Sequence, residues 1–264
     1  MNLDLSGKRA LVSGSTRGIG YAAALGLADM GATVLINGRT KDTTDAAVGR
    51  ARTARPAARF EAAPGDLSTA VGANEVITAA RDLDILVNNM SIYDIKAFSD
   101  IADSEWQKFL DTNVMSGIRL TRHFLPAMLK KNWGRVVFVS SESGLHIPEE
   151  MIHYGVTKAA QLAVARGCAE LTKGTGVTVN SVLPGPTWVE GLAEKFASRA
   201  KAQGATVEAL QQQMFATRRP TSLLQRFEAP EEIANMICYV CSPAASATNG
   251  AGLRCDGGIV RIPF

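Results

Sequence analysis

Short apolar runs alternate with longer amphipathic or Ala-rich segments along the chain. Runs that are rich in β-branched residues and bounded by Gly, Pro, Asn or Ser are typical of buried strands, and the longer segments between them are typical of helices. The predicted strands lie at residues 8–13, 32–37, 59–62, 83–88, 135–140, 177–183 and 251–255. The clearest predicted helices lie at residues 21–30, 42–55, 104–131, 151–173 and 230–242.

The alternation of strands with helices predicts an α/β fold. We expect a doubly wound, mainly parallel seven-stranded sheet of the Rossmann-like type, with helices on both faces. The length of 264 residues allows one or two domains, but no internal repeat or low-complexity linker divides the chain. The sequence therefore predicts a single domain over residues 1–264.

Two local signals concern the long helix predicted at residues 104–131. Ser104 and Gln107 have the spacing of a capping box, which marks a helix start. Pro126 lacks a backbone N–H and so disturbs a helix interior. We therefore expect the helix to begin at Ser104 and to be kinked or ended at Pro126.

Composition and charge are typical of a globular protein. The chain is 46% hydrophobic and 20% charged, so it can bury a sizeable core. The formal net charge is only +3 and no long basic run occurs, which argues against a nucleic-acid partner. No run approaches the ~18 apolar residues that a membrane helix needs, and residues 1–9 lack an apolar signal core. We therefore expect a soluble cytoplasmic protein with no membrane partner.

The cysteines and histidines predict no metal site. Cys238 and Cys241 form a Cys-x-x-Cys pair, but neither a second Cys pair nor a His pair at ligand spacing accompanies it. The pair falls late in a predicted helix, whereas a reactive thiolate is stabilised at a helix start. We interpret both cysteines as small core residues.

Three side chains suited to proton transfer are predicted to converge at one edge of the sheet. Ser141 follows the strand at 135–140, and Tyr154 and Lys158 lie one helical turn apart on the next helix. A free phenol titrates near ~10, too high for a base at neutral pH, but a nearby ammonium lowers its pKa. A serine hydroxyl can hold a substrate oxygen. A Tyr-x-x-x-Lys pair alone is commonly a surface feature, and its place after Ser141 is what favours catalysis.

A glycine-rich turn predicts a dinucleotide site. Gly14, Gly18 and Gly20 lie between the first strand and the first helix, with the spacing Gly-x-x-x-Gly-x-Gly. Glycines at such a turn allow backbone amides and the helix N-terminus to approach a pyrophosphate. The predicted cofactor-binding residues of the turn are Gly14, Ser15, Arg17, Gly18, Ile19 and Gly20.

Together these motifs resemble the short-chain dehydrogenase/reductase family, in particular its compact single-domain members that are similar to 3-oxoacyl reductases. The resemblance covers nearly the whole chain. It implies an NADP(H)-dependent oxidoreductase that interconverts a carbonyl and a secondary alcohol of a small-molecule substrate by hydride transfer. The implied catalytic residues are Asn113, Ser141, Tyr154 and Lys158.

The resemblance also implies a role for each of these four residues. Tyr154 is the general acid or base, and Ser141 holds the reacting oxygen. Lys158 binds the nicotinamide ribose and lowers the pKa of Tyr154. Asn113 holds a water that relays protons to Lys158, although a mid-helix Asn taken alone is more commonly solvated or bonded to the backbone.

Further cofactor contacts follow from the resemblance. An Asp after the third strand contacts adenine in the family, which indicates Asp66, and a turn Asp ahead of a helix is equally compatible with this position. Met90 and Ser91 stand where the family usually has Ala-Gly, so the cofactor pocket is expected to differ there. Val189 takes the usual threonine position, and Thr187 is expected to bind the nicotinamide amide or a phosphate instead. The remaining implied contacts are Leu67, Asn88, Tyr154, Lys158, Pro184 and Gly185.

NADP(H) is predicted as the preferred cofactor, with NAD(H) less favoured. NAD-specific relatives carry an acidic residue at the end of the second strand, where it binds both ribose hydroxyls. Gly38 stands there and offers no carboxylate, Arg39 follows it, and Arg17 lies in the glycine turn. Two guanidinium groups suit a 2′-phosphate. The alternative is that both arginines are ordinary solvated surface charges, which would say nothing about the cofactor.

Residues 190–227 are predicted to form a substrate lid. The segment is polar, and Gly204 and Pro220 divide it into helical pieces. In the relatives, the helix that carries Lys158 and the long helix before it form subunit contacts. We therefore expect a homo-oligomer, either a dimer or a homotetramer.

Two other functions stay open at this point. A non-catalytic NADPH-binding sensor on the same fold is favoured only by Met90 and Ser91, and the intact catalytic set argues against it. A sugar epimerase or dehydratase of the longer relatives would need an added substrate domain, for which 264 residues leave no room.

Overall fold

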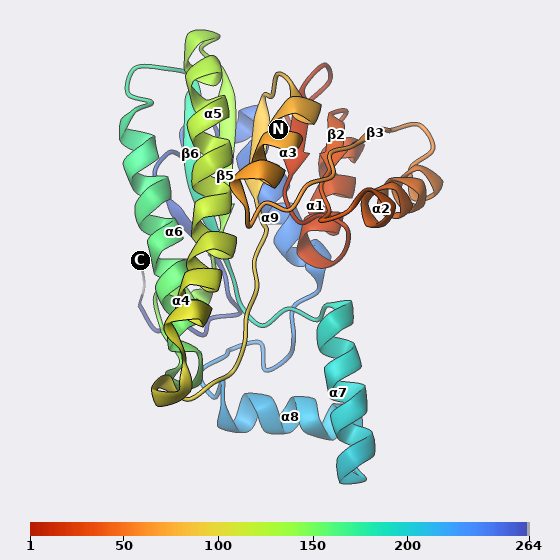
Figure 1. Ribbon diagram of the computed structural model, residues 1–264, viewed down its shortest axis with the longest axis vertical. Helices are drawn as coiled ribbons and strands as arrows, with labels where there is room; N and C mark the ends of the chain where they lie inside the picture. Colours follow the sequence, from red (N-terminus) through yellow and green to blue (C-terminus); the bar gives the residue numbers. More distant parts are fainter. Residues whose placement is uncertain (263–264) are drawn as a thin grey trace.

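The computed structural model describes residues 1–262, which form a seven-stranded sheet in the order β3-β2-β1-β4-β5-β6-β7. Every neighbouring pair of strands is parallel. This is the predicted doubly wound, Rossmann-like topology (Figure 1). The strands are β1 Arg9–Val12, β2 Thr33–Ile36, β3 Arg59–Ala62, β4 Ile85–Asn88, β5 Gly134–Val139, β6 Val177–Pro184 and β7 Gly252–Cys255.

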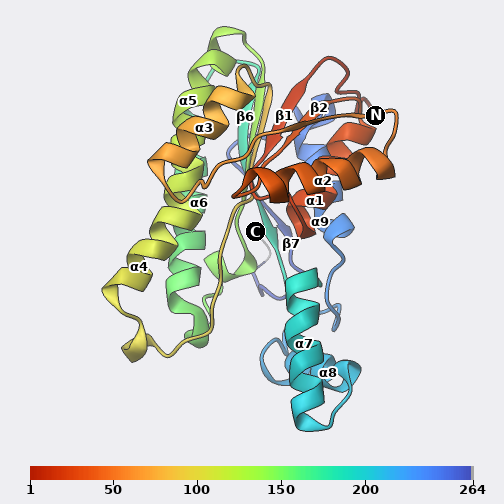
Figure 2. The same ribbon diagram turned by 45° about the vertical axis from the view of Figure 1, so that its right-hand side comes forward.

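Helices flank both faces of the sheet, and two more project beyond one end of it (Figures 1 and 2). The flanking helices are α1 Gly18–Asp29, α2 Lys41–Ala54, α3 Ala70–Ala80, α4 Asp103–Phe109, α5 Ser116–Lys130, α6 Ile152–Glu170 and α9 Pro230–Cys241. The projecting helices are α7 Glu190–Gln203 and α8 Val207–Thr217, which lie in the segment predicted as a lid.

Each face of the sheet has its own apolar core, because successive strand residues point to opposite sides. Val12 of β1 packs with residues of α1, α2 and α9 on one face. Its neighbour Leu11 packs with residues of α3, α5 and α6 on the other face. Burial on both sides explains why the strands are continuous apolar runs in the sequence.

The start of the helix predicted at residues 104–131 differs from the prediction. The helix begins at Asp103, so the capping box assigned to Ser104 and Gln107 is wrong. Ala102 precedes the first turn, and its backbone N–H donates to Glu105 Oε2 at 3.2 Å. Half of the capping pattern is therefore present two residues earlier in the chain, without a side-chain acceptor at the cap.

The interior of this helix also differs from a regular α-helix. A π-helical segment at Leu110–Met115 joins α4 to α5. Pro126 lies inside α5, which continues to Lys130, so the predicted end at Pro126 is wrong. Pro126 is on the exposed side of α5, where solvent can satisfy the carbonyl that loses its donor.

The two cysteines of α9 are buried core residues, as predicted. Cys238 and Cys241 are free thiols, and burial raises the pKa of Cys238 to about 12. A Cβ at Gly26 of α1 would lie 2.6 Å from Cys238 Sγ, so the two helices approach closely at this point. Within residues 1–262, no helix is both long and apolar enough to span a membrane.

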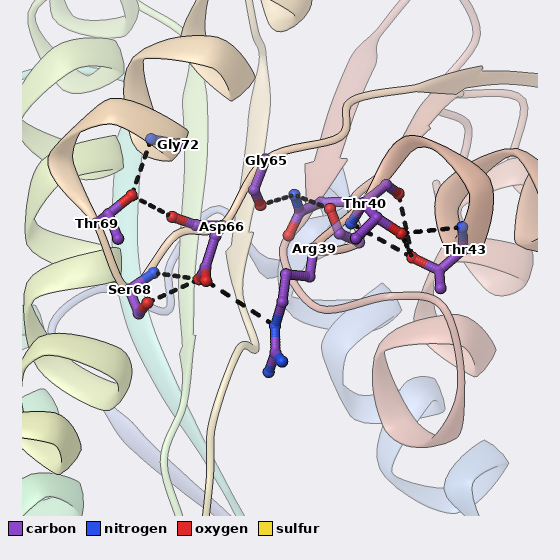
Figure 3. A network of polar contacts seen from close by, with 10 residues as sticks. Arg39, Thr40, Thr43, Gly65, Asp66, Ser68, Thr69 and Gly72 are labelled. Carbon is purple, nitrogen blue, oxygen red and sulfur yellow. Dashed lines mark hydrogen bonds and ion pairs between the residues drawn. The ribbon is translucent and has the colours of Figure 1, made fainter.

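The start of α3 packs against the turn after β3 (Figure 3). Thr69 caps the helix by accepting the Gly72 N–H at 3.0 Å. Asp66, in the preceding turn, accepts the Ser68 N–H at 3.0 Å. A Cβ at Gly72 would lie only 2.3 Å from the Asp66 carbonyl oxygen, so this helix start depends on a glycine.

Gly72→Ala is therefore expected to lower the free energy of unfolding by about 1–3 kcal/mol, because its methyl group would overlap backbone atoms. Gly49→Ala in α2 is the matched control, since nothing lies within 4 Å of the new methyl group there. Gly49→Ala is expected to raise the free energy of unfolding by about 0.5–1 kcal/mol. Urea unfolding measures both, and equal effects would contradict this account of Gly72.

Candidate active site

The carboxyl ends of the central strands border a cavity of about 1470 Å³. In open parallel sheets this edge is where ligands bind. The cavity extends from the glycine turn and the loop after β2 to α6, α7 and α8. The predicted site residues that line it are Gly14, Arg17, Gly18, Ile19, Gly20, Gly38, Arg39, Asp66, Ser141, Tyr154, Lys158, Pro184, Gly185 and Thr187.

Three predicted cofactor residues have side chains that are turned into the protein. Ser15 Oγ donates to the Val12 carbonyl at 2.6 Å, and Leu67 is fully buried in the core. Asn88 Nδ2 donates to Thr121 Oγ1 at 3.0 Å. These side chains support the walls of the cavity without lining it.

Ser141, Tyr154 and Lys158 meet at the carboxyl end of β5. Ser141 lies two residues after the end of β5 and accepts the Ser143 N–H at 3.1 Å. Tyr154 and Lys158 project from the same part of α6, and Lys158 Nζ is 5.4 Å from the centre of the Tyr154 ring. The convergence that the spacing predicts is therefore present in the structure.

Burial controls the titration of both α6 groups. It raises the pKa of the Tyr154 phenol, by more than the hydrogen bond with Ser141 lowers it. It lowers the pKa of Lys158 to about 7. Burial outweighs the groups that lower the pKa of Tyr154, and Lys158 is not one of those groups.

Asn113 lies in the π-helical segment and ties the loop after β4 to α6. Its Oδ1 accepts the Ile92 N–H at 2.8 Å. Its Nδ2 donates to the Ile92 carbonyl at 3.0 Å and to Thr157 Oγ1 at 2.9 Å. The side chain therefore joins the loop after β4 to α6, and the water relay that the resemblance implies for Asn113 stays a prediction.

Gln161, which the sequence analysis missed, lies between Asn113 and Lys158. Its Nε2 donates to the Asn113 carbonyl at 2.6 Å, and its Oε1 accepts from Lys158 Nζ at 3.2 Å. Lys158 Nζ also donates to the Val139 carbonyl at 3.0 Å. A glutamine inside a helix is ordinary, so no local sequence signal marks this one.

Glu142 and Arg219 form a largely buried ion pair that joins the predicted lid to the end of β5. Arg219 Nε donates to Glu142 Oε1 at 3.2 Å, and the two side chains are only 12% and 4% exposed. Glu142 Oε2 accepts the Ser141 hydroxyl at 3.1 Å. Arg219 also lies 3.6 Å from Glu150 Oε1. The sequence carries no local signal for this pair, because its members are far apart in the chain.

The glycine turn needs residues without side chains. Gly14 and Gly18 both have φ of +59°, which other residues rarely adopt. A Cβ at Gly20 would lie 2.4 Å from Asn89 Nδ2. That nitrogen donates to the Ser13 carbonyl at 2.9 Å and to the Gly14 carbonyl at 3.0 Å. The end of β4 therefore holds the turn in place at the start of α1.

Two predicted departures from the family pattern contact this turn. A Cβ at Gly14 would lie 3.0 Å from Met90 Cα, and a Cβ at Gly18 would lie 3.1 Å from Val189 Cγ1. Met90 and Val189 therefore form the cavity wall beside the two left-handed glycines.

Arg39 and Asp66 face each other at the far end of the cavity (Figure 3). One carboxylate oxygen of Asp66 accepts the Ser68 hydroxyl at 2.7 Å. The other lies 3.9 Å from Arg39 Nε. Asp66 is thus a turn residue that also borders the cavity, so both interpretations of it are compatible with the structure.

Gly38 has no space for a side chain. A Cβ there would lie 2.6 Å from Thr16 Cγ2 and 2.7 Å from Thr44 Oγ1. An acidic residue therefore does not fit at this position without movement of the threonines. Arg50, which the sequence analysis missed, donates to the Thr16 carbonyl at 2.7 Å and lines the same end of the cavity.

The segment predicted as a lid leaves and rejoins the sheet at adjacent points. The Glu228 N–H donates to the Pro186 carbonyl at 2.9 Å, and the Trp188 N–H donates to the Glu228 carbonyl at 2.8 Å. The Glu228 carboxyl accepts the Gly185 N–H at 3.0 Å. Burial raises the pKa of this carboxyl to about 8.

The residues along the cavity fit a nicotinamide dinucleotide. One end offers Arg39 and Asp66, the middle offers backbone amides of a glycine turn at a helix N-terminus, and the other end offers Tyr154 and Lys158. These are the groups that could hold an adenosine, a pyrophosphate and a nicotinamide riboside in that order.

Residues 8–201 match the family model described as short chain dehydrogenase. The chain is 45% identical to the uncharacterized oxidoreductase YvaG of Bacillus subtilis, over 100% of both chains. It is 32% identical to the D-beta-hydroxybutyrate dehydrogenase of Cupriavidus necator, over 97% of this chain and 99% of that one. The solved L-sorbose reductase of Gluconobacter frateurii, complexed with NADPH and L-sorbose, is 27% identical with a TM-score of 0.93, over 99% of this chain and 100% of that one.

We expect the ion pair of Arg219 with Glu142 to hold the segment predicted as a lid against the end of β5. Arg219→Met is expected to increase amide hydrogen exchange in α8 by roughly fivefold, since a hydrogen-bonded charge pair of about 1 kcal/mol is lost. Arg226→Met is the matched control, because Arg226 belongs to the same segment but pairs with the exposed Glu232 outside it. Mass spectrometry of exchanged peptides measures both variants, and equal exchange in α8 would contradict the tether.

Proposed function

The chain belongs to the short-chain dehydrogenase family of NAD(P)-dependent oxidoreductases, and we propose that it uses NADP(H) to interconvert a carbonyl and a secondary alcohol on a small molecule. One observation carries most of this proposal. Ser141, Tyr154 and Lys158 meet at one end of a single cavity that also includes the glycine turn.

In the proposed reaction, Tyr154 exchanges a proton with the substrate oxygen while Ser141 holds that oxygen. Burial raises the pKa of Tyr154, so the phenol is protonated at neutral pH and can donate to a carbonyl oxygen. NADPH, when bound, supplies the hydride. The ammonium form of Lys158 stabilises the phenolate that remains and binds the hydroxyls of the nicotinamide ribose.

The preference for NADP(H) rests on the cations at the far end of the cavity. The Arg39 side chain is 73% exposed and can turn toward a ligand, while an acidic side chain at Gly38 would require the neighbouring threonines to move. Arg50 adds a third guanidinium to those of Arg39 and Arg17. The L-sorbose reductase that this chain resembles is complexed with NADPH.

The surface of α6 supports the proposal of a homo-oligomer, either a dimer or a homotetramer. Val156, Ala163 and Gly167 form an exposed strip on this helix. Among residues 1–262, nothing lies within 4 Å of a Cβ built at Gly167, so a second helix could approach closely here. We also propose that the protein works in the cytoplasm.

The alternative is a non-catalytic NADPH-binding sensor. It is favoured by the contact of Met90 with Gly14, which changes the wall of the cofactor cavity. A panel of diverse ketones, L-sorbose, 3-oxoacyl thioesters and secondary alcohols separates the two functions. NADPH binding without turnover of any of them would favour the sensor.

Tyr154→Phe is expected to reduce turnover by about 10²–10⁴-fold while NADPH still binds, because only the proton donor is removed. Lys158→Ala is expected to lose both turnover and NADPH affinity. Tyr239→Phe on α9 is the control for a tyrosine outside the cavity. NADPH oxidation measures turnover and NADPH fluorescence measures binding. Turnover of Tyr154→Phe close to that of Tyr239→Phe would refute the mechanism.

Arg39→Leu is expected to lower kcat/KM with NADPH by more than about tenfold, since a phosphate contact contributes about 1.5–3 kcal/mol. Its kcat/KM with NADH should change little, because NADH lacks the 2′-phosphate. Arg59→Leu on β3 removes an arginine that does not line the cavity and serves as the control. An equal loss with both cofactors would contradict the assignment of Arg39.

A further inference from the structure

Gln161 is a buried polar residue that the proposed reaction does not use. Its exposed fraction is 2%, and it lies one helical turn after Lys158 on α6. Both ends of its amide are bonded, one to the Asn113 carbonyl and the other to Lys158 Nζ. Gln161 therefore joins the π-helical segment to the buried amine of the site.

The orientation of this amide follows from the chemistry of its neighbours. A backbone carbonyl only accepts hydrogen bonds, so the Gln161 NH₂ group must face Asn113. The amide oxygen is then left to face Lys158, where it is an acceptor. The second partner of Lys158, the Val139 carbonyl, is also an acceptor.

The backbone near Asn113 is shaped by the π-helical segment. Regular i to i−4 bonding is interrupted there, and the Ser116 N–H donates to the Asp111 carbonyl, five residues back. The Asn113 carbonyl lies in this segment and is 2.6 Å from Gln161 Nε2. The π-helical segment thus holds Gln161 through the Asn113 carbonyl, and Gln161 in turn holds Lys158 Nζ.

We propose that Gln161 is a positioning residue that fixes the Lys158 ammonium and takes the place, between Asn113 and Lys158, that the family resemblance gave to a relaying water. This inference rests on the proposed function. A side-chain amide does not pass on a proton as a water molecule does. Lys158 therefore acts as a fixed charge, and no proton passes from it to the Asn113 carbonyl through Gln161.

Both bonds of Lys158 favour its charged form. Val139 and Gln161 offer only acceptors to it, so they oppose the burial that lowers its pKa. Removal of the Gln161 oxygen should therefore lower the pKa of Lys158 further. The lower pKa of Lys158 should change each property that depends on its charge, including the affinity for the ribose of the cofactor.

The elements that pack against Lys158 carry other titratable and charged groups. Tyr154 shares its helix, and Glu142, on the turn after β5, is paired with Arg219 from the lid. In the π-helical segment, Asp111 is paired with Arg119 at 3.4 Å. All of these groups are left unchanged by a substitution at Gln161, so they form a constant background in the test.

The test measures the affinity of the full-length protein for NADPH, by NADPH fluorescence, from mildly acidic to alkaline pH. In the unmodified protein the affinity should fall as pH rises through the pKa of Lys158, because the charge is lost. In Gln161→Leu the midpoint should move to lower pH by about one unit, since a hydrogen bond to a charged group is removed. Gln161→Glu keeps an acceptor, so its midpoint should lie at or above the unmodified value.

Two further variants separate positioning from stability. Gln161→Asn retains polarity but is too short to bridge both partners, so it should behave like Gln161→Leu. Thr172→Val removes a different buried hydroxyl at the end of α6. It should lower the melting temperature without a shift of the midpoint. The pH profile of kcat/KM, for the carbonyl compound that the substrate panel identifies, should move as the NADPH midpoint does.

The outcomes for Gln161 and for the proposed reaction are distinguishable, because NADPH binding requires no substrate. An active enzyme with the same midpoint in Gln161→Leu, Gln161→Asn and the unmodified protein would overturn the role of Gln161 alone. An unmodified protein whose affinity shows no midpoint would overturn it as well. Absence of turnover with the whole panel would count against the proposed reaction only.

Discussion

An amine removed from water needs acceptors inside the protein, and the site is built around the place where Lys158 finds them. One acceptor is the Val139 carbonyl at the end of β5, and the other is Gln161 on the same helix as the lysine. Gln161 in turn rests on the Asn113 carbonyl. A strand, a helix and a π-helical segment must therefore stay in register, because a shift of any of them leaves a buried polar group unpaired at a cost of about 1–3 kcal/mol.

Two sets of hydrogen bonds at the carboxyl ends of the central strands hold the two ends of the cavity. Ser13 Oγ accepts the backbone N–H groups of Asn89 and Met90 at 2.9 and 3.0 Å, which joins the end of β1 to the end of β4. The Asn89 side chain continues this network into the glycine turn. On the other side, Asn113 bonds Ile92 and Thr157, which joins the same loop to α6. A ligand that contacts both ends therefore meets walls whose separation the fold has already set.

The features that follow from local pattern could be predicted from the sequence, and those that follow from distant contacts could not. Alternation of apolar runs with helical segments predicts the parallel sheet, and helical spacing places Tyr154 beside Lys158. Gln161 and the pair of Glu142 with Arg219 depend on contacts between separate elements, which no local motif records. The pKa of Tyr154 depends on burial, and spacing does not report burial. The capping box at Ser104 failed for a local reason, because two capping pairs are possible in this stretch and Glu105 accepts the backbone N–H of Ala102.

The way in which residues 190–227 are joined to the rest of the fold has a consequence for how the sequence of this protein can vary. Its two ends are bonded to each other through Glu228, Pro186 and Trp188 before the chain returns to the sheet. The excursion between them is thus a closed loop, and the entropy of closing such a loop grows only slowly with its length. Insertions, deletions or wholesale replacement within α7 and α8 would therefore leave the strand ends, the glycine turn and the α6 groups where they are. Variation in this segment can therefore change the part of the cavity that α7 and α8 line without moving Ser141, Tyr154 and Lys158.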